Sequence, residues 1–249
     1  MIVLFEGIGA IVLLTLSSLR ELFRRPFELR LIVEQLAKGG IESWSITILT
    51  AVFTGMVMAM QFAIGLEPFG ASMYTGKLVS LGIVRELGPV LTALLVGGRV
   101  GAGFTAEIGT MAVTEQIDAI RCLGASPIRK LVMPRVVAMT FILPLLTLLA
   151  DIVGCCGGAL ISIVEVGTTT QYAFKQMIDT VGPEDLLHGL GKSAFFGYFI
   201  AIISCWVGMS ARGGAESVGK ATTQTVVYTS VTILVSDFLL TRLFLAIYG

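Results

Sequence analysis

Long apolar stretches dominate the hydropathy pattern of this chain, and each approaches or exceeds the roughly 20 residues that a helix needs to cross a bilayer. Five stretches qualify, at residues 45–66, 78–102, 131–164, 193–211 and 226–248. We therefore expect an all-α integral membrane protein with five transmembrane helices, organised as a single membrane domain over residues 1–249.

The composition supports this interpretation. Hydrophobic residues make up 55% of the chain and charged residues only 14%, with a mean hydropathy of +0.90, whereas soluble domains carry about 25% charged residues. So much apolar surface cannot be hidden in one small core. The formal net charge is zero, so nothing favours a nucleic-acid partner.

The N-terminal segment is ambiguous. The apolar run 2–19 is interrupted by Glu6 and by several small polar residues, and residues 20–38 mix apolar side chains with Arg and Glu at helical spacing. No basic residue precedes the run, unlike a cleaved signal peptide. We expect residues 1–40 to form an interfacial helix, an elbow before the first span; the alternative is a sixth span.

Lys and Arg residues in the loops indicate the orientation, because cytoplasmic loops carry an excess of them. Basic residues cluster in residues 20–38, in the segment between the second and third spans, and after the fourth span. Only Lys77, Lys175 and Lys192 fall in the opposite loops. This places the N-terminal segment in the cytoplasm and the C-terminus outside.

Two charged residues and a proline interrupt the second span. Arg85, Glu86 and Pro89 lie near its start. A charged side chain near the bilayer centre costs about 2.5–3.5 kcal/mol, so these charges call for protein or water around them. Neighbouring helical residues point about 100° apart, so at least one of the pair should face an interior cavity or another subunit. Arg suits a phosphate, which makes a phospholipid headgroup a sensible ligand. The alternative is an interfacial pair whose side chains reach the headgroups.

The first span ends in methionines at alternate positions, Met56, Met58 and Met60, followed by Gln61 and Phe62. Such a soft surface could accommodate a flexible apolar guest, although packing within the membrane explains methionine equally well.

Residues 107–120, after the second span, are too polar to cross the membrane and too apolar for a solvated linker. Their pattern predicts a short amphipathic helix. An exposed cytoplasmic helix would suit docking of a soluble partner; a helix lying against the membrane is the alternative.

Several kinds of chemistry lack the residues they need. The four cysteines form no C-x-x-C pair, and His188 is the only histidine, so we expect no metal site. The run 214–221 resembles a phosphate-binding loop, but Ala221 replaces the required hydroxyl residue. We expect no cofactor in this chain and no ATP hydrolysis.

The runs 87–101, 106–111, 114–119 and 213–223 resemble the MlaE/YrbE family of permeases, over nearly the whole chain from about residue 20. The resemblance implies a non-catalytic permease subunit of an ABC transporter in the bacterial inner membrane. Such a transporter would move phospholipids or related hydrophobic molecules between the inner and outer membranes and maintain outer-membrane lipid asymmetry.

The family also implies partners. They are a second copy of the chain, a cytoplasmic ATPase dimer that binds ATP and Mg²⁺, an MCE-domain periplasmic substrate-binding protein expected as a hexamer, and a small STAS-like accessory subunit.

The resemblance assigns residues to two roles. Expected at the lipid site, in a cavity at the dimer centre, are Met58, Gln61, Gly65, Leu66, Phe69, Arg85, Glu86 and Leu87. Expected on a coupling helix that docks to the ATPase are Glu107, Thr110, Met111, Thr114, Glu115, Asp118 and Ala119. Some family members have Tyr where Phe69 stands. Gly65 has no side chain and can contribute little to the wall of the cavity.

Two other classes of function deserve comparison. A stand-alone channel or secondary transporter would show an ion relay and an inverted repeat, and the odd number of spans argues against it. A membrane-embedded enzyme would need clustered His or Asp ligands, which are missing from the sequence.

Overall fold

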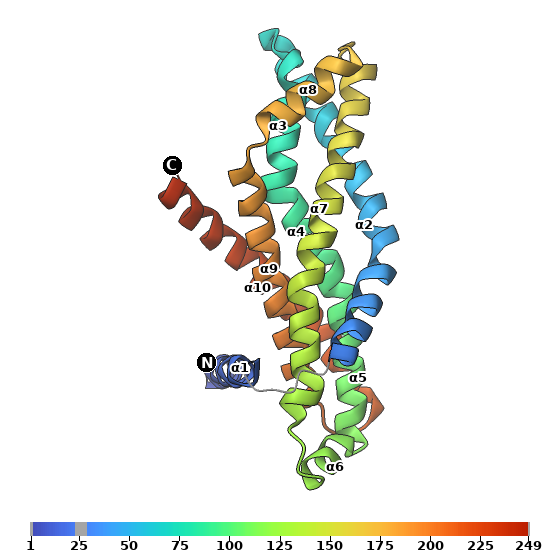
Figure 1. Cartoon of the computed structure of the whole chain (residues 1–249), viewed down its shortest axis with the longest axis vertical. Helices are drawn as coiled ribbons and strands as arrows, with labels where there is room; N and C mark the ends of the chain where they lie inside the picture. The colour runs from blue at the N-terminus through green and yellow to red at the C-terminus, as the bar shows by residue number, and fades with distance from the viewer. Residues whose placement is uncertain (1, 23–28, 249) are drawn as a thin grey trace.

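The computed structural model describes residues 2–22 and 29–248, which form a bundle of long helices (Figure 1). The α-helices are α1 (Ile2–Leu22), α2 (Leu29–Leu66), α3 (Thr75–Gly82), α4 (Gly88–Val96), α5 (Ala102–Val113), α6 (Gln116–Cys122), α7 (Met133–Val164), α8 (Thr170–Thr180), α9 (Pro183–Met209) and α10 (Ala215–Tyr248). Short 3₁₀ turns are η1 (Glu67–Phe69) and η2 (Ser72–Tyr74), and π-helical turns are η3 (Ile83–Leu87), η4 (Gly97–Gly101) and η5 (Ile128–Val132).

Within the described ranges, five helical segments are long and apolar enough to cross a membrane. They are Leu29–Phe69, Ser72–Val113, Ile128–Val164, Pro183–Met209 and Ala215–Ala246. The predicted all-α architecture with five candidate spans is therefore confirmed. The helical segments extend beyond most of the expected spans because helix continues where the sequence turns polar.

The second span is not one regular helix. It runs from α3 through η3, α4 and η4 into α5, so two π-helical turns interrupt it. Such turns insert an extra residue, rotate the side chains that follow, and are frequent at functional sites. The turn η3 carries Arg85 and Glu86, and η4 carries Arg99.

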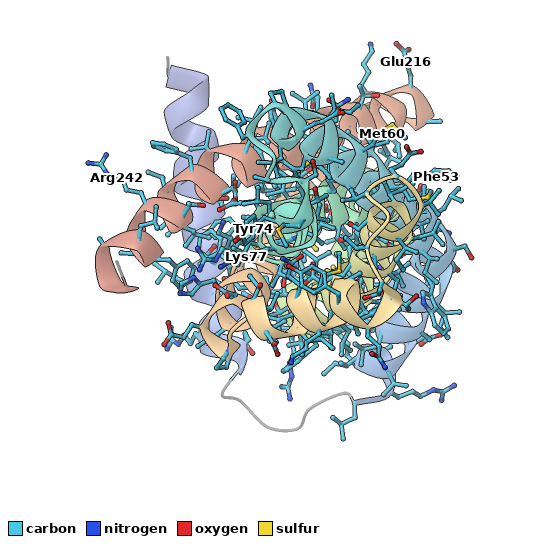
Figure 2. The ribbon with its side chains drawn as sticks, turned by 90° about the horizontal axis from the view of Figure 1, so that it is seen from above. Phe53, Met60, Tyr74, Lys77, Glu216 and Arg242 are labelled. Atoms are coloured by element: carbon cyan, nitrogen blue, oxygen red, sulfur yellow. The ribbon has the colours of Figure 1, made fainter. Side chains whose placement is uncertain are left out.

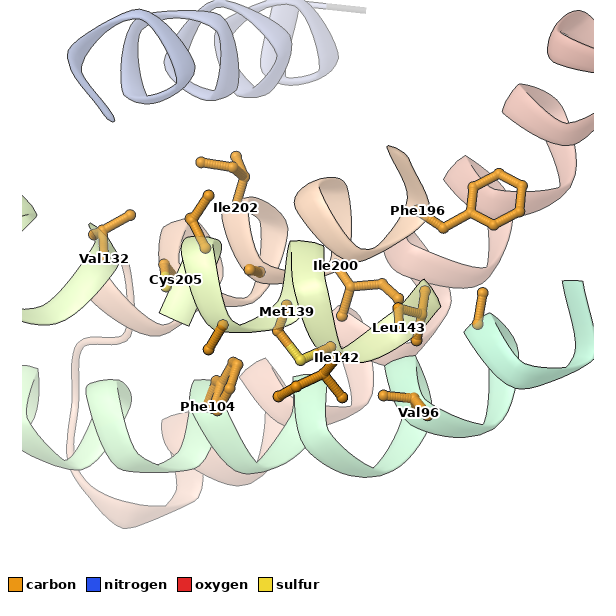
Figure 3. Close-up of a cluster of buried hydrophobic side chains, with 14 of the residues drawn as sticks. Val96, Phe104, Val132, Met139, Ile142, Leu143, Phe196, Ile200, Ile202 and Cys205 are labelled. Carbon is orange, nitrogen blue, oxygen red and sulfur yellow. The ribbon is translucent and has the colours of Figure 1, made fainter. Parts of the chain in front are cut away.

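Helices α7 and α9 form the centre of the bundle and pack against each other and against α2, α4 and α5. Their inward faces meet α4 and α5 in the main hydrophobic core, where Val96, Phe104, Met139, Leu143 and Ile200 are almost completely buried (Figure 3). This core holds the helices that carry the charged residues described below.

Glycines bring α2 and α7 into direct backbone contact. A Cβ atom on Gly55 would lie 1.9 Å from the carbonyl oxygen of Gly154, and one on Gly157 would lie 2.6 Å from that of Val52. Small residues allow this close approach in membranes, where packing rather than hydrophobicity drives association. The glycines of the third candidate span therefore have a specific packing partner, α2.

The N-terminal region differs from the single interfacial helix expected over residues 1–40. Helix α1 ends at Leu22, and α2 begins at Leu29 and continues to Leu66, so residues 29–40 extend the first span. Two basic residues used for the orientation, Arg24 and Arg25, lie outside the described residues. Helix α1 lies across the long axis of the bundle, near the end that carries α5 and α6 (Figure 1).

Helices α2 and α10 lie at the rim of the bundle and expose apolar faces. Phe53 and Met60 of α2 point outward on one side, and Arg242 of α10 projects on another (Figure 2). Along α2 the exposed side chains include Leu49, Phe53, Val57, Met60 and Ile64, and along α10 they include Val231, Leu234, Val235, Phe238 and Leu239. Such surfaces require lipid or another protein to cover them.

Candidate functional site: a buried charged cluster

Lys192 of α9 is the centre of a charged cluster in the bundle. Its side chain is only 2% exposed, and its Nζ atom lies 2.8 Å from Glu86 Oε2 and 3.1 Å from Asp237 Oδ1. It also donates a hydrogen bond to Thr241 Oγ1 at 2.6 Å. Helices α9 and α10 and the turn η3 therefore meet at one ammonium group.

A proline explains one further contact of Lys192. Because Pro89 has no N–H group, it cannot donate the usual helical hydrogen bond to the carbonyl of Arg85, four residues earlier. Lys192 Nζ donates to this carbonyl oxygen at 3.1 Å. Proline is tolerated in a membrane helix when a neighbouring group satisfies the freed carbonyl, and here a buried lysine does so.

Arg85 and Glu86 have different partners, as their angular separation predicts. While Glu86 binds Lys192, Arg85 donates from Nε to Asp185 Oδ1 at 2.6 Å. Asp185 also accepts a hydrogen bond from the backbone N–H of Gly182 at the start of α9. The guanidinium of Arg85 remains about half exposed, so it can still reach a ligand at the surface of the single chain.

The other residues expected at the lipid site lie along α2, η1 and η3. Met58 and Leu66 are partly buried, and Met58 packs against the small core of Ala59, Val79 and Ile83. Gln61, Gly65 and Phe69 are exposed, and Phe69 is 82% exposed. Leu87 lines a small cavity between α2, α4 and α7. The structure thus brings Glu86 to Lys192 and Arg85 to Asp185, and it leaves Gln61 and Gly65 of α2 and Phe69 of η1 exposed.

Most residues expected to contact the ATPase form an exposed tip at one end of the bundle (Figure 1). Helix α5 ends at Val113 and α6 begins at Gln116, so the helix expected over residues 107–120 is divided in two. Glu115 lies at the break with φ of 59°. Thr110, Thr114, Glu115, Asp118 and Ala119 are exposed, while Met111 packs partly against the core.

Glu107 has a different environment from the rest of this group. Its carboxylate forms ion pairs with Lys38 of α2 and, at 2.7 Å, with Arg135 of α7. Arg135 in turn lies over the ring of Phe104. Glu107 therefore links the middle of α5 to two neighbouring spans inside this chain.

Several ionisable residues of the bundle were not anticipated as site residues from the sequence, among them Asp185, the partner of Arg85. Lys192 was expected in an outer loop, because it directly precedes an apolar run; in the structure it is buried within α9. Asp237 and Asp151 lie in the middle of apolar runs, and an acid in such a run is itself a signal. The partners of Lys192 and Asp237 are far away in sequence, and Asp151 has no hydrogen-bond partner among the described residues, so only the fold identifies these environments. No group of metal-ligating side chains was found among the described residues.

The sequence is similar to those of a permease family and of several individual proteins over most of its length. Residues 32–243 match the profile of a family described as Permease MlaE. The chain is 40% identical to a probable ABC transporter permease protein of Rickettsia conorii over 96% of this chain and 92% of that protein. It is 34% identical to the intermembrane phospholipid transport system permease protein MlaE of Haemophilus influenzae, over 86% and 82% of the two chains. It is also 39% identical to the chloroplast protein TRIGALACTOSYLDIACYLGLYCEROL 1 of Arabidopsis thaliana, over 85% and 61%.

Proposed function

The chain belongs to the MlaE permease family, as a multi-pass, non-catalytic permease subunit of an ABC transporter for lipid trafficking, and on this premise we propose that it moves phospholipids between the inner and outer membranes and maintains outer-membrane lipid asymmetry. The observation that carries the proposal is the Lys192-centred cluster, which places charge beside the exposed apolar helix α10. A lipid needs both environments, one for its headgroup and one for its tails.

The rim helices support a homodimer. The apolar faces of α2 and α10 are far more exposed than those of α7 and α9. Two copies that bring these faces toward each other would enclose a cavity lined by Met58, Gln61, Gly65, Leu66 and Phe69, together with Leu87. Acyl chains would contact this wall.

The charged cluster would hold the headgroup. Arg85 would bind the phosphate, sharing its guanidinium with Asp185, because only part of the arginine is engaged in the single chain. Glu86 and Asp237 place negative charge nearby. The cluster therefore carries both signs and suits a headgroup that pairs a phosphate with an amine.

The tip formed by α5 and α6 would dock to the ATPase, which binds ATP and Mg²⁺. The contact would be formed by exposed residues of the tip, with Met111 behind them: Thr110, Thr114, Glu115, Asp118 and Ala119. When the ATPase moves the tip, Glu107 would transmit this movement to α2 and α7 through its ion pairs. In this arrangement α1 lies at the membrane–water interface, and the N-terminal segment and the tip are cytoplasmic. The C-terminus is periplasmic, and on that side an MCE-domain hexamer would receive or deliver lipid. A STAS-like subunit would accompany the ATPase.

Lipid retained by the purified complex tests the cargo. We expect Arg85→Glu to lower the amount of co-purified phospholipid several-fold, measured by mass spectrometry against protein. Lys175→Glu is the matched control, because Lys175 is an exposed base on α8, and it should retain the wild-type amount. Equal phospholipid in both variants would remove Arg85 from the lipid site.

Co-purification with the ATPase tests the tip. Replacing Glu115 and Asp118 together with Lys should release the ATPase from the tagged permease, because both side chains are exposed and reverse their charge. Replacing Glu165 and Asp179 with Lys, exposed acids beyond the far end of α7 and on α8, should leave the complex intact. Retention of the ATPase by the first variant would contradict the docking assignment. A wild-type chain that bound no ATPase would favour a stand-alone channel or secondary transporter.

A further inference from the structure

We propose that Asp151 of α7, together with Thr147 one turn before it, forms a proton-binding site within the membrane domain. In this proposal the carboxyl group is neutral while α4 and α7 pack as they do here, and it releases its proton when the two helices separate. The site is distinct from the Lys192-centred cluster. Only its link to the transport cycle rests on the proposed function.

The burial of unpartnered oxygens points to this site. Asp151 is 3% exposed, and neither of its carboxyl oxygens has a hydrogen-bond partner among the described residues. Thr147 is fully buried, and its hydroxyl likewise lacks a partner there. Residues four apart lie on one face of a helix. Three buried oxygens therefore lie on the same side of α7 without a protein donor.

No cation in the described part of the bundle is available to balance a charge on Asp151. Between Glu42 and Glu67, helix α2 has no charged side chain, and α4 has none at all. Other titratable groups on the packed elements are engaged elsewhere, exposed at the surface, or thiols. They include Arg85 with Asp185, Glu86 and Asp237 with Lys192, Arg135 with Glu107, His188 stacked on Phe244, the exposed Lys77 on α3, and Cys155 and Cys156 further along α7.

An unpaired carboxylate in such surroundings is too costly to persist, so the group becomes neutral by binding a cation. Metal ions need more ligands than the site has. Ca²⁺ takes six to eight oxygens and Mg²⁺ an octahedron, whereas the orphaned side chains supply three. A proton needs only one oxygen, which the carboxyl group supplies.

The position of the carboxyl links its charge to the helix that carries the lipid-site residues. Asp151 Oδ1 occupies the space of a missing side chain, because a Cβ atom on Gly88 would lie 1.9 Å from it. Gly88 is the first residue of α4, directly after the turn that holds Arg85 and Glu86. A charged carboxylate would draw water into this contact and separate the two backbones.

Water has a place from which to enter. A cavity of about 20 Å³ lies between α2, α4 and α7, lined by Gly88, Ala150 and the threonines Thr47, Thr50, Thr54 and Thr92. This volume holds about one water molecule, and the hydroxyls can bind it. Proton exchange with Asp151 would therefore accompany a small widening between α4 and α7, which would shift Arg85 and Glu86.

Infrared spectroscopy of the full-length permease in lipid nanodiscs tests the proposal. At neutral pH we expect the wild type to show a carbonyl band of a protonated carboxylic acid, and the Asp151→Asn variant to lose it. Asp179→Asn, at an exposed aspartate of α8, and Asp237→Asn, at the other aspartate within an apolar run, are controls that should keep the band. An Asp151→Asn variant that loses carboxylate absorption while keeping the acid band would overturn the proposal.

A second measurement does not depend on a folded variant. Wild-type permease with ¹³C in its aspartate carboxyl groups should show the acid band shifted by the heavier isotope at neutral pH. An acid band without an isotope shift would mean that every aspartate is ionised, and would overturn the proposal. Neither experiment requires bound phospholipid or ATPase, so its failure is distinct from failure of the proposed function.

Discussion

Lys192 and Asp151 are both buried ionisable residues in the apolar bundle, but they are stabilised in opposite ways. Lys192 has two carboxylates, a hydroxyl and a backbone carbonyl within hydrogen-bonding distance or ion-pair contact. Asp151 has no side-chain or backbone donor among the described residues. Lys192 is therefore a buried charge that its partners fix in place, whereas Asp151 is a buried group that must remain neutral.

Because of this difference, Lys192 holds helices together, whereas Asp151 can respond to a movement of the helices. A fully partnered charge holds α9, α10 and η3 together and can change only if several contacts break at once. A group that is neutral only because it is buried responds to any movement that admits water. Lys192 should therefore dominate stability, and Asp151 should dominate the response to a change in packing.

Removal of Lys192 should have the largest effect. Lys192→Met leaves Glu86 and Asp237 without their cation, and breaking a buried pair in this way costs about 3–5 kcal/mol. We expect a large fall in the thermal unfolding midpoint of the detergent-purified chain. Lys175→Met, at an exposed lysine of α8, should change it little.

A compensating variant sharpens this prediction. Adding Glu86→Gln and Asp237→Asn to Lys192→Met removes the stranded charges and should recover most of the loss, since neutral packing can replace a buried ion pair. If the single and the triple variants were equally unstable, Lys192 would contribute through its packing and not through its charge.

Filling the space beside Asp151 should have an intermediate effect. Gly88→Ala places a methyl group where Asp151 Oδ1 lies, and overpacking of this kind costs about 1–3 kcal/mol. Gly98→Ala is the matched control in the same span, because a Cβ atom there meets nothing within 4 Å.

The double variant Gly88→Ala with Asp151→Ala should be more stable than the sum of the single variants predicts, because the clash is removed. Additive effects on the denaturation midpoint would show that Gly88 and Asp151 are not in contact, and the link between the carboxyl group and η3 would fail.

Neutralising Asp151 should have the smallest effect on stability. If the carboxyl group already carries a proton, Asp151→Asn preserves shape and charge and adds one buried N–H donor, at a cost of about 1–3 kcal/mol or less where the neighbouring cavity supplies an acceptor. Equilibrium unfolding in denaturant measures the change. A gain of several kcal/mol would instead reveal that an ionised carboxylate had been removed.

Much of the fold could be predicted from the sequence because a transmembrane helix is marked by a local run of apolar residues. The apolar runs around α7 and α10 are long and nearly free of charge, so their existence follows from residue type alone. The irregular parts depend on tertiary contacts. The π-helical turn η3 carries Arg85 and Glu86, and Gly88 directly after it lies against Asp151 of α7, a contact that no local pattern encodes.

The candidate site was predictable in part for the same reason. Arg85 and Glu86 stood out because two adjacent charges interrupt an apolar run. Lys192 did not, since it directly precedes such a run and reads as a loop residue. Asp151 is a single acid in a long span, and only the structure shows that the oxygens around it lack partners.

The central claim is that the Lys192-centred cluster and the exposed faces of the rim helices form the wall of a phospholipid cavity between two copies of the chain. An experimental structure of the purified complex in a lipid nanodisc tests it most directly. The account predicts lipid density between the two copies, with a headgroup within hydrogen-bonding distance of Arg85 and tails along α2. Solid protein packing between the copies, with Arg85 and Glu86 facing bulk water, would contradict it.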